Sequence, residues 1–428
     1  MLLNIFNLII ITFFVNIYKR FPFPYSFVNG TPNIYLTPKF YLTDILLILL
    51  PLIALTLKVA PSLKGFAWRK PVTLYDIYCW GRDLVTREFF PFLLLVGFTL
   101  AGALSKNVSL SFYSLARLGL YLYLFYCVRS VLGGSKQTFR TALFLTVPVL
   151  AVSILAMLQW REQRYVWGFF PFGEPLFSPS FANSPLVNYL GTVRLRAFGT
   201  FPHPNILGGF LAVSLVWIID GFLNSLRKGY SHVVPLYQFS VILLGLFALF
   251  VSFSQGAWAA FILGVVLYVL ISLSGGQRPR FRVTYLIVSF AILLFSFSYI
   301  YKLPFEAAST RRHDLIKTAL NLWWTHPVVG VGPGNFVALS SYYWKEPVHN
   351  IYLLVLSETG IVGFLPFIFL LSYCLRNSLK KVFWDPLPAV LLVEVLFLGL
   401  FDHYLFTSAA GSLIFWIVLG MAASRSQA

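Results

Sequence analysis

The stretch HNIYLLVLSETGIVGFLPFIFLLSYCL, residues 349–375, decides the class of fold, and its one charged residue is Glu358. From Asn350 onward it is long enough to cross the hydrocarbon core of a bilayer as a helix. A backbone in lipid must satisfy its own hydrogen bonds, which a continuous apolar run achieves as a helix. We therefore predict a transmembrane helix over 350–375.

The rest of the chain repeats this pattern. Of its 428 residues, 58% are hydrophobic and 11% are charged, whereas soluble domains carry about 25% charged residues. A spanning β-barrel would need short alternating strands instead of continuous runs. The sequence predicts an all-α polytopic membrane protein, a single membrane domain over 1–428, with about twelve spans: roughly 1–17, 41–57, 89–105, 110–128, 139–158, 205–223, 234–252, 257–273, 283–301, 350–375, 388–404 and 406–423.

The net charge of +18 comes from basic residues spread over many short loops. This spread does not form the basic stripe of a nucleic-acid-binding protein. Most of these residues fall on one side of the expected topology, which predicts that both termini are cytoplasmic. Lys19 and Arg20, directly after the first span, run against this bias.

Two connections are much longer than the others, at about 160–204 and 302–349, and this topology places both on the outer face. Long loops in compact domains usually carry a function. Both contain arginines, although outer loops are normally poor in basic residues. In the second loop, apolar residues between Thr310 and Thr325 recur at helical spacing, which predicts an amphipathic helix lying on the membrane surface.

The first loop ends in RAFGTFPHPNILGGF, residues 196–210. Asn205 stands where a helix N-cap would satisfy unpaired backbone amides. His203 lies between two prolines, which favours a structural role. Arg196 has no such explanation, and its guanidinium would suit an anionic lipid or a diphosphate.

The second loop ends in a glycine-rich turn, HPVVGVGPGNF, residues 326–336. Because no strand precedes Gly330 and Gly332, a dinucleotide site is excluded. Two interpretations stay open: a simple turn, or a backbone that approaches a lipid phosphate closely.

His349 and Asn350 stand at the mouth of the span that opened this section. A histidine there is either an interfacial residue or a functional one, and Asn350 suits a cap or an orienting partner. Glu358 lies deep in the span, where a carboxylate is costly without a partner. The nearby Gly360 and Pro366 predict a broken helix that Glu358 supports.

Other chemistries fit the sequence less well. The carboxylates of the outer loops are scattered, so we expect no metal site and no cofactor. Ionisable residues within spans would also suit a transporter or flippase of anions or lipid-linked glycans. We find no convincing internal repeat of the kind transporters show, and we keep this class as the alternative.

Three segments in order, 196–210, RHDLIKTALNLWWTHPVVGVGPGNF (312–336) and HNIYLLVLSETGIVGF (349–364), resemble the signature of the O-antigen ligase and O-antigen polymerase superfamily. The resemblance implies a GT-C-like protein of the bacterial inner membrane and a metal-independent glycosyltransferase. Such an enzyme takes a glycan from polyprenyl (undecaprenyl) diphosphate and transfers it to a hydroxyl of a glycan, lipid or protein acceptor at the periplasmic face. Its product is lipopolysaccharide or another cell-envelope polysaccharide. The choice among ligase, polymerase and protein glycosylation stays open.

The resemblance also assigns roles to residues. It makes His349 catalytic and Arg196 and Arg312 diphosphate-binding, with Arg311 kept because pattern alone does not separate adjacent arginines. Guanidinium groups stabilise charge on a departing diphosphate, and imidazole can take the acceptor's proton or orient the diphosphate. One departure from the family is Ser254-Gln255-Gly256, where members often have Ser-Arg-Gly. Supporting roles fall on Asn205, Asn350, Gly330, Gly332, Glu358 and His203.

Overall fold

The computed structural model describes most of the chain: residues 7, 9–12, 15–28, 31–49, 89–132, 135–166, 172–181, 184–274, 309–340 and 345–424. The predicted span 283–301 lies outside the described residues, as do most of 1–17 and the second half of 41–57. Residues 42–49 are helical.

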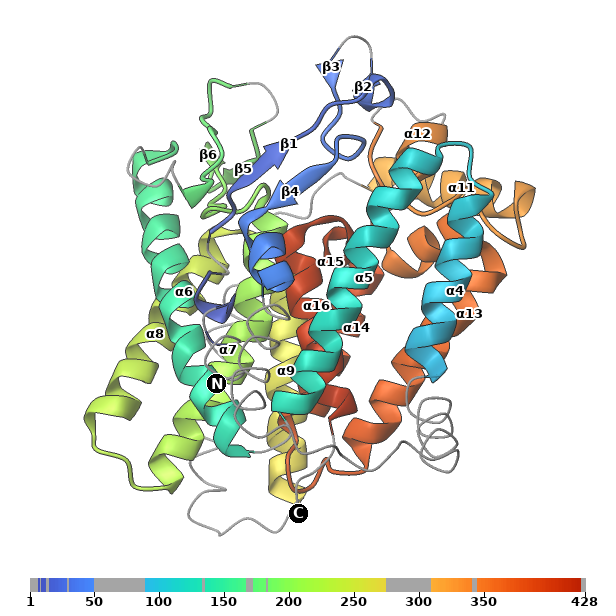
Figure 1. Cartoon of the computed structure of the whole chain (residues 1–428). Helices are drawn as coiled ribbons and strands as arrows, with labels where there is room; N and C mark the ends of the chain where they lie inside the picture. The colour runs from blue at the N-terminus through green and yellow to red at the C-terminus, as the bar shows by residue number, and fades with distance from the viewer. Residues whose placement is uncertain are drawn as a thin grey trace, which may run out of the picture.

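The described chain is a bundle of apolar helices, as predicted (Figure 1). Six of the described helices are long and apolar enough to cross a membrane, and three more are apolar but shorter. The fold class, an all-α polytopic membrane protein, is therefore confirmed. The six are α5 (Val108–Val131), α6 (Ser135–Glu162), α7 (Pro204–Arg227), α8 (Val233–Val251), α9 (Gln255–Ser274) and α13 (Ile351–Leu379); the shorter three are α4 (Phe89–Ala103), α14 (Leu387–Phe401) and α16 (Ala409–Ala423).

Helix α7 forms the centre of the bundle, because it packs against α6, α8, α9, α14 and α16. Its side chains are buried almost throughout, which explains why it reads as apolar on every face. Both of its ends carry sequence signals: Pro204 occupies the first turn, and Arg227 lies in the last turn, where it complements the helix dipole.

One end of the bundle carries short elements that the apolar pattern does not predict (Figure 1). Three small antiparallel sheets form there. Strand β1 (Tyr18–Arg20) pairs with β4 (Lys39–Tyr41), β2 (Phe27–Val28) with β3 (Thr31–Pro32), and β5 (Leu186–Tyr189) with β6 (Thr192–Leu195); the 3-10 turn η2 (Pro24–Ser26) precedes β2. We call residues 16–41, which hold the first two sheets, the N-terminal ribbon.

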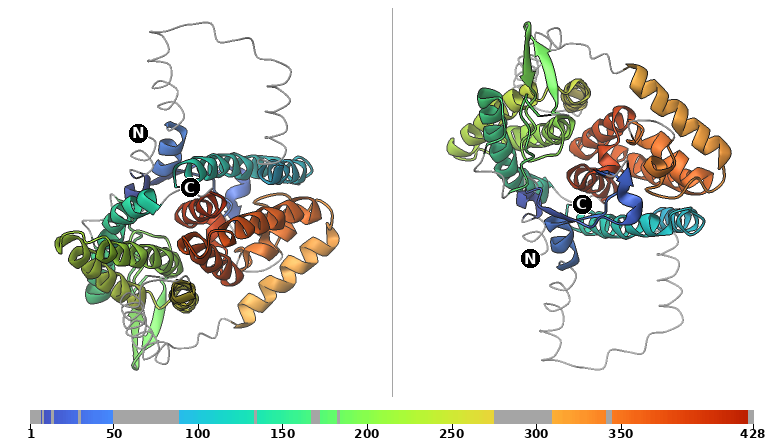
Figure 2. Two further views of the ribbon diagram at one scale, coloured as in Figure 1. Left: turned by 90° about the horizontal axis from the view of Figure 1, so that it is seen from below. Right: turned by 90° about the horizontal axis from the view of Figure 1, so that it is seen from above.

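The segment expected to be an amphipathic helix forms α11 (Ser309–Thr325). Figure 2 shows α11 running along the outside of the bundle beside α13, with which it is in contact. The short α12 (Phe336–Leu339) follows the glycine-rich turn.

The last two spans begin and end differently from the prediction. Helix α14 ends at Phe401, and the expected span 406–423 is divided at Ser408 into α15 (Tyr404–Thr407) and α16. Asp402 takes an extended conformation between α14 and α15. A continuous apolar pattern hides this break, because the polar pair Asp402-His403 occupies only two positions.

Helix α13 is broken at Gly360, where φ is +57°, a left-handed conformation that favours glycine. The glycine-rich turn fits into this break: the amides of Ile361 and Val362 donate to the carbonyls of Pro327 and Val328. A Cβ on Gly360 would lie 2.3 Å from the Val328 carbonyl oxygen. The break is thus fixed by close backbone contact.

Glu358 has its partners in the same turn. Its carboxylate accepts hydrogen bonds from the backbone amides of Gly334 (2.8 Å) and Phe336 (3.2 Å). The interpretation of Glu358 as a buried carboxylate that supports the broken span agrees with this geometry. Two backbone donors offset the cost of burying its charge or its dipole.

We predict that Glu358→Leu strongly destabilises the protein. The substitution leaves two buried amides without an acceptor, at about 1–3 kcal/mol each. Thermal unfolding of the detergent-purified protein should show a clear drop in midpoint, whereas Glu162→Gln, on an exposed side chain, should not. Equal midpoints for wild type and Glu358→Leu would contradict the assigned role.

Candidate functional site

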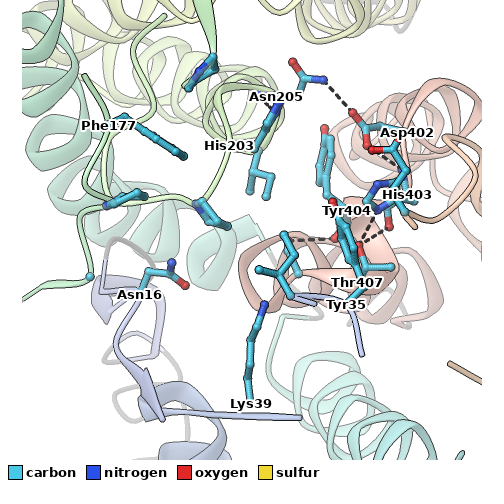
Figure 3. Close-up of a pocket in the computed structure, with 18 of the residues that line it drawn as sticks. Asn16, Tyr35, Lys39, Phe177, His203, Asn205, Asp402, His403, Tyr404 and Thr407 are labelled. Atoms are coloured by element: carbon cyan, nitrogen blue, oxygen red, sulfur yellow. Dashed lines mark hydrogen bonds between the residues drawn. The ribbon is translucent and has the colours of Figure 1, made fainter. Parts of the chain in front are cut away.

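A cavity of about 1520 Å³ opens at the end of the bundle that carries the small sheets. It is lined by the N-terminal ribbon, the loop between α6 and α7, the starts of α11 and α13, and the junction of α14 with α15. Figure 3 shows that side chains from these segments point toward one space. Arg196, His203, Asn205, Arg311, Arg312 and His349 all line it, so segments that are far apart in the sequence meet here.

Arg196 lines this cavity from the loop before α7, and only 6% of its surface is exposed. Its Nε donates to the carbonyl of Ser252 (2.9 Å), and one terminal nitrogen donates to the side-chain oxygen of Asn205 (2.7 Å). Because the guanidinium is ordered by the protein before any ligand arrives, it is suited to bind an anion at low entropic cost.

The N-cap prediction for Asn205 is wrong. His203 caps α7, since its Nδ1 accepts from the Asn205 amide, and Pro204 is the first helical residue. The Asn205 side chain is thereby released to join two groups: it accepts from Arg196 and donates to Asp402 (2.9 Å). The Asn205–Asp402 hydrogen bond is drawn in Figure 3.

His349 lies between two carboxylates. Its Nδ1 is 3.5 Å from Asp402, and its Nε2 is 3.9 Å from Glu346. These distances exceed those of good hydrogen bonds, so the contacts are ion pairs. Burial alone would lower the pKa of His349, but Asp402 and Glu346 outweigh it and raise the pKa to about 9. The imidazole is therefore protonated at neutral pH.

His403 lies beside His349, with ring centroids 4.9 Å apart. Its backbone amide donates to Asp402 (2.8 Å), and its Nδ1 is 2.7 Å from the Thr407 hydroxyl. Burial and the positive charge of His349 lower the pKa of His403 to about 4, so of the two adjacent rings one is charged and the other neutral.

The two adjacent arginines, Arg311 and Arg312, differ in whether a carboxylate pairs with them. Arg311 makes a two-point contact with the carboxylate of Glu346, so its charge is compensated. Arg312 is half-buried and lines the cavity, and within the described ranges no carboxylate lies in ion-pair distance of it. Both arginines line the cavity, and Arg312 is the one whose charge no carboxylate of the described residues compensates.

The remaining predicted residues lie around the cavity rather than in it. Asn350 is the N-cap of α13 and accepts from the Leu353 amide (2.9 Å), which confirms the capping prediction. Gly330 and Gly332 are buried against α13 and Ser105 and are absent from the cavity lining. The interpretation of their backbone as a phosphate-approaching surface is therefore wrong, because a protein backbone already occupies that space.

Two parts of the site are not predicted from the sequence. Asp402 and His403 lie between two apolar runs, and no site role is expected for either. The N-terminal ribbon supplies much of one cavity wall. Its signal was the cluster of Lys19, Arg20 and Lys39 on a face where basic residues are disfavoured.

Ligand-type atoms of His349, Asp402 and His403 lie within 4.8 Å of one another. Imidazole and carboxylate are suitable donors for zinc-like ions. However, the ion pair between His349 and Asp402 accounts for this closeness without a metal. The expectation of no metal site stays a prediction.

These features define a polytopic membrane protein with a cationic cavity at one end of its bundle. Residues 240–368 match the family model described as O-antigen ligase, and this match supports assigning the chain to the O-antigen ligase superfamily. The matched region includes Arg311, Arg312, the glycine-rich turn, His349 and Glu358. No curated protein matches the chain. The family supports a role in glycan transfer for polysaccharide biosynthesis and a glycosyltransferase-type activity.

We predict that Asp402→Asn lowers the pKa of His349 by about 1 to 3 from its value near 9, because a carboxylate in contact stabilises the imidazolium. Histidine-labelled protein in nanodiscs, titrated by NMR, measures this change, and His349→Gln assigns the resonance. A His349 pKa that does not respond to Asp402→Asn would rule out the ion pair.

Proposed function

We propose that the protein transfers a glycan from a polyprenyl diphosphate to an acceptor hydroxyl at the outer face of a bacterial inner membrane. Arg196 and Arg312 hold the diphosphate, and His349 completes the site. The family match supports the class of reaction. The observation that carries the choice of donor is the charge of the cavity wall around His349.

The cavity wall around His349 carries more positive than negative charges. Arg196, Arg311, Arg312 and protonated His349 supply four positive charges, and Asp402 and Glu346 supply two negative ones. Two positive charges are left uncompensated within this group. A glycan–diphosphate–lipid diester carries about two negative charges at neutral pH, so it would neutralise the excess.

The raised pKa favours one of the two roles open to His349. At pH 7 a group with a pKa near 9 is about 99% protonated, and a bound diphosphate would stabilise the proton further. His349 therefore acts as a cation that orients the diphosphate and stabilises its departure, rather than as the base that activates the acceptor.

The chemical step then balances without a further group. The bond between the sugar anomeric carbon and the diphosphate oxygen breaks, and its electron pair stays on the diphosphate. The acceptor oxygen forms the new glycosidic bond, and its proton passes to an oxygen of the departing diphosphate. Arg196, Arg312 and His349 surround the atoms on which negative charge grows.

We predict that Arg312→Gln lowers the rate of polyprenyl diphosphate release about 100-fold, the usual loss when one preorganised donor to a developing anion is removed. Purified protein with a polyprenyl-diphosphate glycan and an acceptor panel measures this rate. The matched control is Lys317→Gln, which removes an exposed charge from the same helix α11. Equal losses for both variants would mean that only the general charge of the helix matters.

The pH dependence separates the two roles of His349. As a cation it loses its proton above its raised pKa, so kcat/KM, which reports the free protein, should be level through neutral pH and fall as the pH passes about 9. As a base it would instead require turnover to rise toward pH 9. In His349→Gln the alkaline fall should disappear, and its persistence would assign it to another group.

The alternative class, a transporter or flippase of lipid-linked glycans, predicts no release of polyprenyl diphosphate. The same assay therefore decides between the classes, because a flippase leaves the donor's diphosphate linkage intact.

A further inference from the structure

A transfer reaction needs a place for the acceptor as well as for the donor, and the cavity has a second cationic group on its opposite wall. Lys39 and Arg20, from the N-terminal ribbon, line the same cavity as Arg196 and Arg312. In Figure 3, Lys39 points from its strand into the space that His203 and Asp402 border from other elements.

The backbone around Lys39 is firmly built. Lys39 pairs with Arg20 between β4 and β1. The Tyr113 hydroxyl on α5 accepts from the Lys39 amide (3.1 Å) and donates to the Lys39 carbonyl (2.8 Å). This double contact fixes the strand to the helical bundle and sets the position from which the lysine side chain extends.

The Lys39 ammonium has no carboxylate partner among the described residues. Nearby, Arg117 is paired with Asp44 at 3.1 Å, so its charge is compensated. Lys39 instead lies 5.4 Å from the centre of the Tyr18 ring, and the guanidinium of Arg20 lies 5.5 Å from the same ring. Burial, together with the positive charges of Arg20 and Arg117, lowers the pKa of Lys39 to about 7. A nearby anion would reverse this effect.

The surroundings of Lys39 include groups that can contact a sugar. Tyr18 and Tyr35 offer aromatic rings, and Asn16 offers a side-chain amide, all within the cavity lining. Of the exposed apolar residues of the ribbon, Ile17 and Ile34 line the cavity, whereas Phe21 and Phe23 do not. Lys39 faces the same cavity.

We propose that Lys39, with Arg20, forms an acceptor subsite that binds an anionic group, a phosphate or a carboxylate, on the acceptor glycan. This inference rests on the proposed function and names the chemistry of its second substrate. The donor's diphosphate and the acceptor's anion then occupy opposite walls of one cavity, with the acceptor hydroxyl between them.

The test uses the full chain in phosphatidylcholine nanodiscs and three probes: glucose 6-phosphate, glucuronic acid and glucose. Sugar binding is measured first without undecaprenyl diphosphate and again with it at saturation, so that in the second arm the donor site is filled and sugar binding reports the second subsite. Saturation-transfer NMR measures the affinities. The variants are Lys39→Gln and Lys39→Arg. The matched control is Lys19→Gln, an exposed lysine of the same ribbon that does not line the cavity.

Wild type should bind one or both anionic sugars about tenfold more tightly than glucose, as expected for one hydrogen-bonded charge. Comparison of glucose 6-phosphate with glucuronic acid shows whether the subsite prefers phosphate or carboxylate. Lys39→Gln should abolish the preference, whereas Lys39→Arg and Lys19→Gln should keep it.

Three results would overturn the inference. Wild type could bind all three sugars equally, a result that needs no variant to fold. Lys39→Gln could discriminate as wild type does. The anionic sugars could be displaced by undecaprenyl diphosphate, or by phosphatidylglycerol in the nanodisc, which would make the subsite a donor or a lipid site. If undecaprenyl diphosphate itself does not bind, the proposed function fails, and the sugar measurements made without it still decide on Lys39.

Discussion

The carboxylate of Asp402 is the contact on which the arrangement of the site depends. It accepts from Asn205 at the start of α7 and forms an ion pair with His349 at the start of α13. It is thus the point where the first large loop, the second large loop and the break before α15 are joined. A buried carboxylate with several partners of opposite charge or donor character is stable, whereas one left alone is costly. This constraint also makes His349 a cation, and it directs Arg196 through Asn205 toward the same cavity.

A second constraint positions Arg312. The glycine-rich turn follows α11 and is fixed to the break in α13 by backbone contacts and by Glu358. Because this turn directly follows α11, its contacts fix where that helix ends, and α11 packs along α13. Glu358, Gly330 and Gly332 therefore act at a distance from the cavity, and they do so by holding the helix that carries the arginine.

Much of the fold and part of the candidate site could be predicted from the sequence. The continuous apolar runs predict the helices. The unexpected arginines of the outer loops indicate Arg196, and the family resemblance adds Arg312 and His349, which the fold brings to one cavity with Arg196. The roles of Arg311 and Arg312 could not be separated, because only the position of Glu346 distinguishes them. Asp402 stayed hidden because an apolar run on each side reads as span. The cap of α7 was misplaced by two residues, since His203 and Asn205 are both polar and flank the proline. The N-terminal ribbon gave no periodicity to read, because its strands have only two or three residues each.

An experimental structure of the protein in nanodiscs with bound undecaprenyl diphosphate tests the proposed site most directly. The two phosphates should lie in the cavity within hydrogen-bonding distance of the Arg196 and Arg312 guanidinium groups, with the His349 ring against them. A diphosphate bound elsewhere on the protein, with these three side chains left facing an unoccupied cavity, would contradict the proposed site.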